Sequence, residues 1–324
     1  SVLQCPTFSS SCAANHRSRI MPLGIRPLVD FAFKKIYGSP ENTPVLIALL
    51  NAILELRHPI TDVTILNPFN YQEFAEGKQI VLDVRAVDST GRLLNIEMQV
   101  AVVAGLTERL AYYACSMYAE QLHSGEDYTD LQPAISICLL NSHLFGDSPQ
   151  AHHRFQLIDR ESGRELPRAI EVHTVELPKY NLSEESIRQA SKIEQWVFFL
   201  LFADQYEAAR LRELLPDLEF QQAITVIESI AAKTEDRVMY DQRQKAQLDH
   251  DWQLKGALQQ GIEIGLERGL EQGLEQGSLA GGIRVLQQLL GEKISTLEEL
   301  RAVPLEELSA RLGELQQRLR SRGN

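Results

Sequence analysis

Two acidic side chains and a glutamine flank a tight turn in the stretch LDVRAVDSTGRLLNIEMQ, residues 82–99. They are Asp83, Glu97 and Gln99. Paired carboxylates, together with carbonyl oxygens and water, are ligands that suit Mg²⁺. The same side chains could instead lie on the solvated face of a sheet. The residue types alone leave both interpretations open.

The turn predicts how these residues face one another. Residues 89–91 fit a three-residue hairpin loop, with Gly91 in the left-handed position. Asp88 then pairs with Arg92, and Asp83 lies opposite Glu97. The even positions form an apolar face that must be core: Ile80, Leu82, Val84, Ala86, Leu94, Ile96, Met98 and Val100. The odd positions form a polar face: Asp83, Arg85, Asn95, Glu97 and Gln99.

The predicted Asp83/Glu97 pair needs a positive charge beside it. Like charges directly opposite each other destabilise a sheet, so two unaided carboxylates are a poor choice for a solvated face. Arg85 could relieve the repulsion as an ion pair, and a divalent cation would relieve it better. The hairpin is therefore the first candidate for a site.

The elements that must position the hairpin follow from hydrophobic periodicity. The pattern predicts helices at 29–37, 43–56 and 106–123, and strands at 63–66, 80–87, 92–103, 134–140, 152–158 and 169–177. The last two strands are expected to form a hairpin at the edge of the sheet. This order indicates a compact α/β unit over 25–180. His152 and His153 should point to opposite faces, which argues against a zinc site.

Helical patterns dominate the rest of the chain, at 184–203, 204–215, 217–231 and on to about 260. Residues 256–282 contain GIEIGLERGLEQGLEQG, with a glycine every four residues. Each glycine costs a helix about 1 kcal/mol relative to alanine, so a linker or weak helix is expected. The alternative is a helix that binds a second copy of the chain through its glycines. Residues 283–324 predict a small helical module with a break at Val303-Pro304.

Composition narrows the class of protein. The 324 residues carry a net charge of −12, so a generic basic nucleic-acid surface is not expected and any DNA contact must be local. No apolar run predicts a membrane span. Four scattered cysteines and the lack of a secretory signal indicate a reducing, cytoplasmic compartment. Residues 1–20 are expected to be a disordered leader or an over-extended gene start.

Four separated segments resemble the PD-(D/E)XK nuclease superfamily, and within it the recombination-promoting nuclease and transposase family. They are DFAFKKIYG (30–38), LDVRAVDSTGRLLNIEMQ (82–99), RLAYYACSMYAEQLHSGEDY (109–128) and LQPAISICLLN (131–141). The resemblance implies a restriction-endonuclease-like α/β core, a mixed central sheet flanked by helices, in a domain at 21–180. A helical extension at 181–255 then precedes the repeat.

The resemblance also assigns roles at the site. Asp83 and Glu97 match the acidic residues that bind Mg²⁺ or Mn²⁺, and Gln99 stands where the superfamily usually has lysine. Asp30, on the first helix, matches the remaining acidic position. The implied activity is cation-dependent hydrolysis of DNA phosphodiester bonds in recombination or transposition. Glutamine can only hydrogen-bond, so it orients water without adding positive charge.

Three further residues could serve the substrate, each with a simpler alternative. Lys34 lies one turn beyond Asp30 and could supply the missing cation, or it could be a surface lysine. Arg109 and Tyr113 share a helix face with Ser116 and Glu120, where they could approach phosphate beside Arg85. That face could equally be a mixed one packed against the sheet. At the level of the whole chain, the rival to a nuclease is a degenerate nuclease fold that binds DNA or oligomerises without catalysis.

Overall fold

The computed structural model describes residues 22–71, 84–122, 125, 127–166 and 169–322. The chain divides into two compact units, Ser1–Leu248 and Asp249–Asn324. Asp83, Ile80 and Leu82 lie outside the described residues, so their predicted positions are not tested. Within the described ranges, no helix is both long and apolar enough to cross a membrane.

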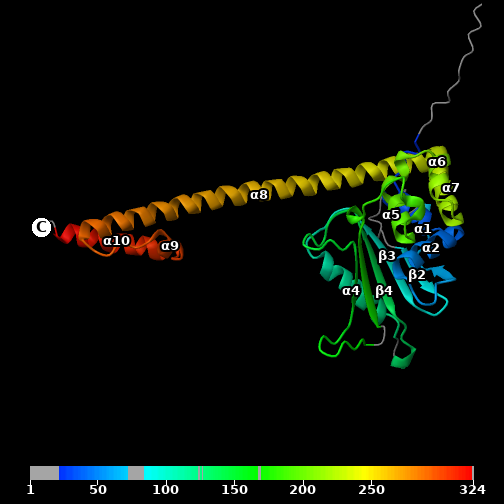
Figure 1. Ribbon diagram of the computed structural model, residues 1–324, viewed down its shortest axis with the longest axis horizontal. Coiled ribbons are helices and arrows are strands. Elements are labelled where there is room, and N and C mark those ends of the chain that lie inside the picture. The colour runs from blue at the N-terminus through cyan, green and yellow to red at the C-terminus, as the bar shows by residue number, and fades with distance from the viewer. Residues whose placement is uncertain (1–21, 72–83, 123–124, 126, 167–168, 323–324) are drawn as a thin grey trace, which may run out of the picture. The chain divides into compact units, whose positions relative to one another are not determined.

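A six-stranded mixed sheet forms the centre of the first unit (Figure 1). Its strands are β1 (Val63–Ile65), β2 (Val84–Asp88), β3 (Leu93–Gln99), β4 (Ala134–Leu140), β5 (His152–Gln156) and β6 (Ile170–Glu176). Their order across the sheet is β1-β2-β3-β4-β6-β5. The β3–β4 and β4–β6 pairs are parallel, and the other three are antiparallel. The predicted mixed sheet and its β5–β6 edge hairpin are confirmed.

The hairpin register agrees with the prediction from the turn. Arg85 pairs with Asn95, and Val84 pairs with Ile96. Gly91 has a φ of 86°, which only glycine adopts without strain. The Asp88 carboxylate closes the loop, because its Oδ1 accepts hydrogen bonds from the backbone N–H groups of Thr90 (2.9 Å) and Arg92 (3.0 Å). The loop is therefore rigidly specified by local chemistry.

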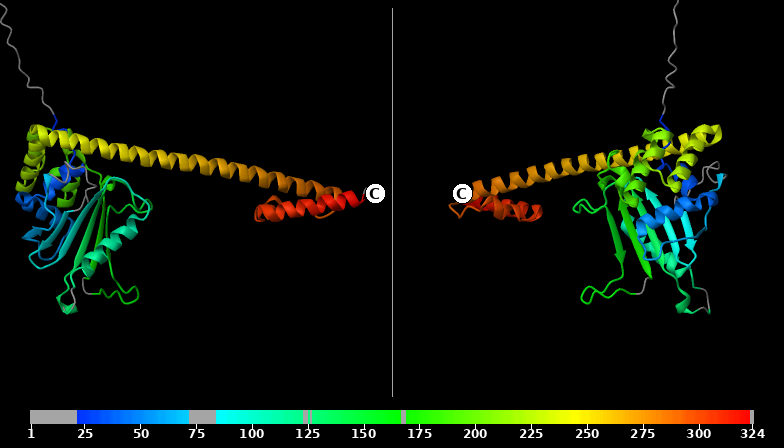
Figure 2. Two further views of the ribbon diagram at one scale, coloured as in Figure 1. Left: turned by 180° about the vertical axis from the view of Figure 1, so that it is seen from behind. Right: turned by 45° about the vertical axis from the view of Figure 1, so that its right-hand side comes forward.

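Helices cover both faces of the sheet (Figure 2). On the apolar face lie α1 (Asp30–Tyr37), α2 (Thr43–Leu54), α5 (Lys192–Phe202), α6 (Ala208–Leu214) and α7 (Leu218–Ala232), which share one core with the even positions of β2 and β3. On the other face, α4 (Leu106–Ala119) packs through Leu106 and Leu110 against Cys138 and Leu140 of β4. Because both faces are covered, all seven residues of β4 are buried.

The glycine repeat lies within a single helix, α8 (Thr234–Leu290). Residues 256–282 are therefore helical, which agrees equally with the expected weak helix and with a helix that binds a second copy of the chain. The repeat leucines are exposed, with Leu266 at 74% and Leu274 at 67%. In the second unit, the end of α8 packs with α9 (Leu297–Arg301) and α10 (Leu305–Arg322) around Ile283, Leu300 and Leu308. The predicted break at Pro304 separates α9 from α10.

Candidate active site

The polar face of the hairpin is buried beneath α4. Asn95 is 2% exposed and Glu97 is 5% exposed, so the solvated-face interpretation is wrong for the two residues at its centre. Gln99 and Arg85, toward its margins, are half-buried. A buried carboxylate costs several kcal/mol unless it is paired and hydrogen-bonded. The surroundings of Glu97 must therefore compensate its charge.

Two donors meet at one oxygen of Glu97. Arg109 Nη2 of α4 lies 2.8 Å from Glu97 Oε1, and Gln99 Nε2 donates to the same oxygen at 2.5 Å. Gln99 reaches Glu97 because side chains two residues apart on a strand point to the same face. Arg109 reaches it because α4 crosses the sheet between the parallel strands β3 and β4. The predicted pair Glu97 and Gln99 is thus brought together, and Arg109 joins them.

The face of α4 that carries Arg109, with Glu120 next to its end, is directed toward the hairpin. Glu120, next to the C-terminal end of α4, accepts a hydrogen bond from Arg85 Nη2 at 3.2 Å. Arg109 and Glu120 therefore both meet the polar face, and half-buried Tyr113 lies between them on the helix. Arg85 and Glu120 keep 38% and 61% of their side chains exposed, so this pair contributes little to stability.

A cysteine that the sequence did not single out lies beside Glu97. Cys138 pairs with Glu97 in the parallel register of β3 and β4 and is fully buried. Burial, followed by the negative charge of Glu97, raises the pKa of the Cys138 thiol well above its usual range, although Arg109 opposes the shift. Burial therefore favours the neutral form of the thiol. Its position across parallel strands left no signal in the sequence.

Asp30 is held by a residue far away in the chain. Arg243 of α8 donates from Nε to Asp30 Oδ2 at 2.7 Å, and its Nη2 also contacts that oxygen. The backbone N–H of Phe31 donates to Asp30 Oδ1. The described contacts thus link Asp30 to α8 and not to β3. No pattern around Arg243 signals this partner, since one arginine in a charged helix has no distinguishing spacing.

Lys34 is 4% exposed, so its interpretation as a surface lysine is wrong. A buried ammonium group needs compensation, just as a buried carboxylate does. Among the described residues Lys34 forms no ion pair, whereas its neighbour Lys35 pairs with Asp236 at 2.5 Å. The burial sets Lys34 apart from the other lysine of α1.

The described residues do not by themselves make a complete cation site. Among them, no group of three or more His, Cys, Asp or Glu side chains is placed to hold a metal ion. Asn95, Glu97 and Gln99 present side-chain oxygens, the donor type that Mg²⁺ prefers. Asp83, the second predicted ligand, directly precedes the first described residue of β2.

The two neighbouring histidines do point to opposite faces of β5. His152 Nε2 lies 2.8 Å from His173 Nδ1, and His173 Nε2 lies 2.6 Å from Glu171 Oε1. His153 instead packs against Phe145, with ring centroids 4.7 Å apart. The histidines therefore belong to two separate environments.

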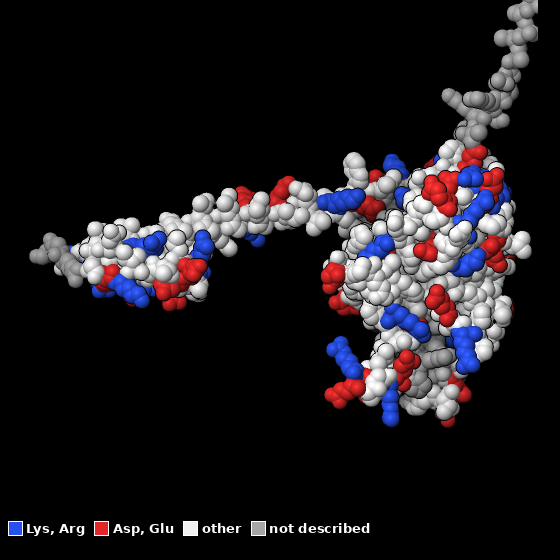
Figure 3. All heavy atoms as spheres, viewed as in Figure 1, with Lys and Arg blue, Asp and Glu red and all other residues white. Residues whose placement is uncertain are grey.

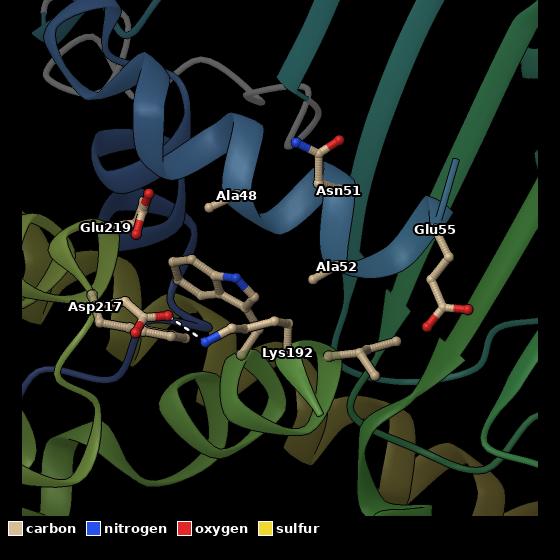
Figure 4. A pocket seen from close by; sticks show the side chains of 10 residues that line it. Ala48, Asn51, Ala52, Glu55, Lys192, Asp217 and Glu219 are labelled. Carbon is tan, nitrogen blue, oxygen red and sulfur yellow. Dashed lines mark hydrogen bonds and ion pairs between the residues drawn. The ribbon is translucent and has the colours of Figure 1, made fainter. Parts of the chain in front are cut away.

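A pocket of about 400 Å³ lies elsewhere, between α2, α5 and α7 (Figure 4). Glu55, Asp217 and Glu219 line it, and Lys192 bridges to Asp217. None of the predicted site residues lines this pocket. On the face shown in Figure 3, acidic and basic side chains are interspersed over the first unit, in keeping with the acidic composition.

Comparison with known families now adds to this geometry. Residues 27–257 match the family described as PD-(D/E)XK nuclease family transposase. No curated protein and no solved structure matches the chain. Because the match spans most of the chain, the protein belongs to this family. The resemblance inferred from the four sequence segments is confirmed, and so is the restriction-endonuclease-like architecture.

Proposed function

We propose that this member of the nuclease family is an endonuclease that hydrolyses DNA phosphodiester bonds, in recombination or transposition, with Mg²⁺ or Mn²⁺ held by Asp83 and Glu97. The observation that carries the proposal is the buried Glu97 carboxylate, which shares a covered polar face with Asn95 and Gln99. Burying such a set of side-chain oxygens costs free energy, and a bound cation would offset that cost.

Each residue of the site has a defined task in this proposal. When bound, the cation polarises the phosphate and lowers the pKa of the attacking water. Glu97 binds the cation, and Gln99 orients either Glu97 or water through its amide group. Lys34 is the proposed source of the positive charge that Gln99 lacks, because it is buried, although α1 covers the opposite face of the sheet. Asp30 takes part only when its pair with Arg243 opens.

Arg85, Arg109 and Tyr113 are the proposed contacts to DNA. Arg85 and Arg109 keep about a third of their side chains exposed, so both can reach a ligand on the polar face. Guanidinium groups match the two-pronged geometry of phosphate oxygens. Since the chain as a whole is acidic, these contacts must be local and the bound cation must offset the carboxylates.

A specific observation also favours the non-catalytic alternative. Arg109 already pairs with Glu97, and Gln99 stands where the superfamily usually has lysine, so the Glu97 carboxylate has a positive partner without a bound cation. A degenerate nuclease would keep this arrangement and use it only to bind DNA or to assemble. The two functions differ in whether Glu97 ever binds a metal ion.

Plasmid cleavage separates these functions. Purified full-length protein is incubated with supercoiled plasmid, with and without Mg²⁺, beside Asp83→Ala. We expect cation-dependent nicking by the wild type and none by Asp83→Ala. Calorimetric titration with Mn²⁺ then follows. If the wild type neither nicks DNA nor binds the cation, the endonuclease proposal is wrong and the non-catalytic alternative stands.

We also propose that residues 256–282 join two copies of the chain. The leucines of the repeat are exposed, and an added Cβ on Gly265 or Gly269 would meet nothing within 4 Å. A helix that carries this many glycines without contacts gains stability if a partner covers them. Light scattering on the full chain and on a chain truncated after residue 255 checks this. An unchanged number of copies after truncation would refute it.

A further inference from the structure

The Glu97–Arg109 ion pair involves a proposed cation ligand, and its two partners are unequally buried. The Glu97 side chain is 7% exposed, whereas that of Arg109 is 35% exposed. The carboxylate is fixed on a central strand between β2 and β4. The guanidinium is carried at the end of a long, flexible side chain near the start of α4. If the pair separates, Arg109 must be the partner that moves.

A divalent cation and Arg109 compete for the same carboxylate. Arginine cannot lose its proton in a protein, so it stays positive beside any incoming cation. Two cations on one buried carboxylate repel each other strongly where the dielectric constant is low. Binding of a cation at Glu97 therefore weakens the Arg109 contact and favours the conformation in which the guanidinium turns away.

A released Arg109 has a suitable new partner in the substrate. Its side chain is already one-third exposed, and half-buried Tyr113 follows one turn later on the same face of α4. A phosphodiester bound beside this face of α4 would offer a negative charge and paired oxygens to the guanidinium. The guanidinium can exchange one oxyanion for another without being left unpaired.

We infer that Arg109 is an exchangeable counter-ion, which holds Glu97 while the site lacks a cation and transfers to a DNA phosphate once the cation binds. This inference rests on the proposed function, because it requires a cation at Glu97. It adds a property that the proposed function alone does not imply. Removal of Arg109 should strengthen binding of the cation while it weakens binding of DNA.

The test is calorimetric titration of full-length protein with Mn²⁺ in the absence of DNA. Arg109→Met removes the competing charge and keeps an apolar side chain of similar length. A charged hydrogen bond of this kind contributes enough to change affinity by about 10-fold, so Arg109→Met should bind Mn²⁺ about 10-fold more tightly. Arg109→Lys keeps the charge but loses the two-pronged geometry of the guanidinium. Its Mn²⁺ affinity should lie between those of the wild type and Arg109→Met.

Arg212→Met is the matched control. Arg212 of α6 is 30% exposed and pairs with Glu228 of α7 at 2.6 Å, so its removal deletes a similar arginine–glutamate pair outside the site. Its Mn²⁺ affinity should equal that of the wild type. Fluorescence anisotropy with a short DNA duplex and Ca²⁺ provides the second measurement. There Arg109→Met should bind DNA more weakly than Arg212→Met.

Each outcome decides between the hypotheses. Tighter Mn²⁺ binding together with weaker DNA binding supports the exchange, and a purely structural Arg109 would weaken both. Unchanged or weaker Mn²⁺ binding by both Arg109 variants, with wild-type circular dichroism, overturns the inference and leaves the proposed nuclease intact. No Mn²⁺ binding by the wild type overturns the proposed cation site and the exchange with it.

Discussion

Two buried glutamates of the same sheet, Glu97 on β3 and Glu171 on β6, are compensated in different ways. They are 5% and 7% exposed and point to opposite faces of the sheet. The described donors of Glu97 meet at one oxygen. Both oxygens of Glu171 are hydrogen-bonded, Oε1 to Arg154 Nε and His173 Nε2 at 2.6 Å each, and Oε2 to Arg154 Nη2 and Gln156 Nε2 at 3.0 Å each.

The difference separates a structural carboxylate, Glu171, from the one that we propose to be functional, Glu97. Burial by itself would raise the pKa of Glu171, yet the hydrogen bonds from His173 and Arg154 lower it to about 2. A carboxylate held by four donors has no capacity for another ligand. Among the described residues, Glu97 pairs with the cation of Arg109, whose side chain is 35% exposed, and we propose that a metal ion can replace it. Burial alone is thus a poor sign of function, and the set of partners is more informative.

The largest effect that tests this contrast is on DNA cleavage. Glu97→Gln removes the charge that binds the cation, so nicking should fall by at least about 100-fold, as for loss of a direct transition-state contact. Glu171→Gln should cleave plasmid at the wild-type rate when both proteins are folded. Gel analysis of time courses gives both rates. An equal loss in the two variants would abolish the distinction between the glutamates.

The next effect is on stability, where the substitution of Glu171 is the one that should cause the loss. Glu171→Gln leaves His173 and Arg154 without their anion, and the free energy of unfolding should fall by about 2 kcal/mol. Arg154 is half exposed and can be rehydrated, which keeps the loss moderate. Urea unfolding followed by circular dichroism measures it. A loss below that of the Arg212→Met control would show that the network around Glu171 is not structural.

The smallest effect is a dependence of stability on pH near His152. Burial, followed by the nearby charges of His173, His153 and Arg154, lowers the pKa of His152 to about 4. The unfolded chain, with a histidine pKa of about 6.5, binds more protons between these values. Stability should therefore be complete above pH 6.5 and fall by roughly 1 kcal/mol toward pH 4, since His152 is partly solvated.

His152→Gln is the variant that checks this pH dependence. Thermal melts of the wild type and of His152→Gln are compared between pH 7 and pH 4. The variant should lose less stability than the wild type over this interval. Glu171 does not interfere, because its lowered pKa places its own contribution below pH 4.5, where stability is lost as the pH falls toward 2. Parallel curves for the two proteins would contradict the prediction.

The sequence was most informative where neighbours along the chain interact. Asp88, Gly91 and Arg92 close the hairpin within a few residues, so the register and the faces of β2 and β3 could be predicted from the turn. The buried strand β4 was likewise predicted with its observed ends, because a short, continuous apolar run has few alternatives. Family resemblance added the roles of Glu97 and Gln99, which spacing alone left open.

The sequence was least informative where partners are far apart. Arg243 lies 213 residues after Asp30 in the sequence and yet donates a hydrogen bond to it. His152 contacts His173 only because β5 pairs with β6. The sequence also left the polar face of the hairpin open to solvent in one of its two interpretations. No local pattern states which helix lies over which face. That choice depends on how all the apolar surfaces are buried together.

What the sequence determined by itself is the hairpin: its loop, its register and the face that carries Glu97, because hydrogen bonds and side-chain alternation over a few residues decide them. What only the tertiary structure decided is whether that face is buried and which side chain pairs with Glu97. The packing of α4 through Leu106 and Leu110 buries Glu97 and brings Arg109 to it. A carboxylate in water needs no partner, but one buried by a helix needs a compensating charge, and the fold brings Arg109 to Glu97.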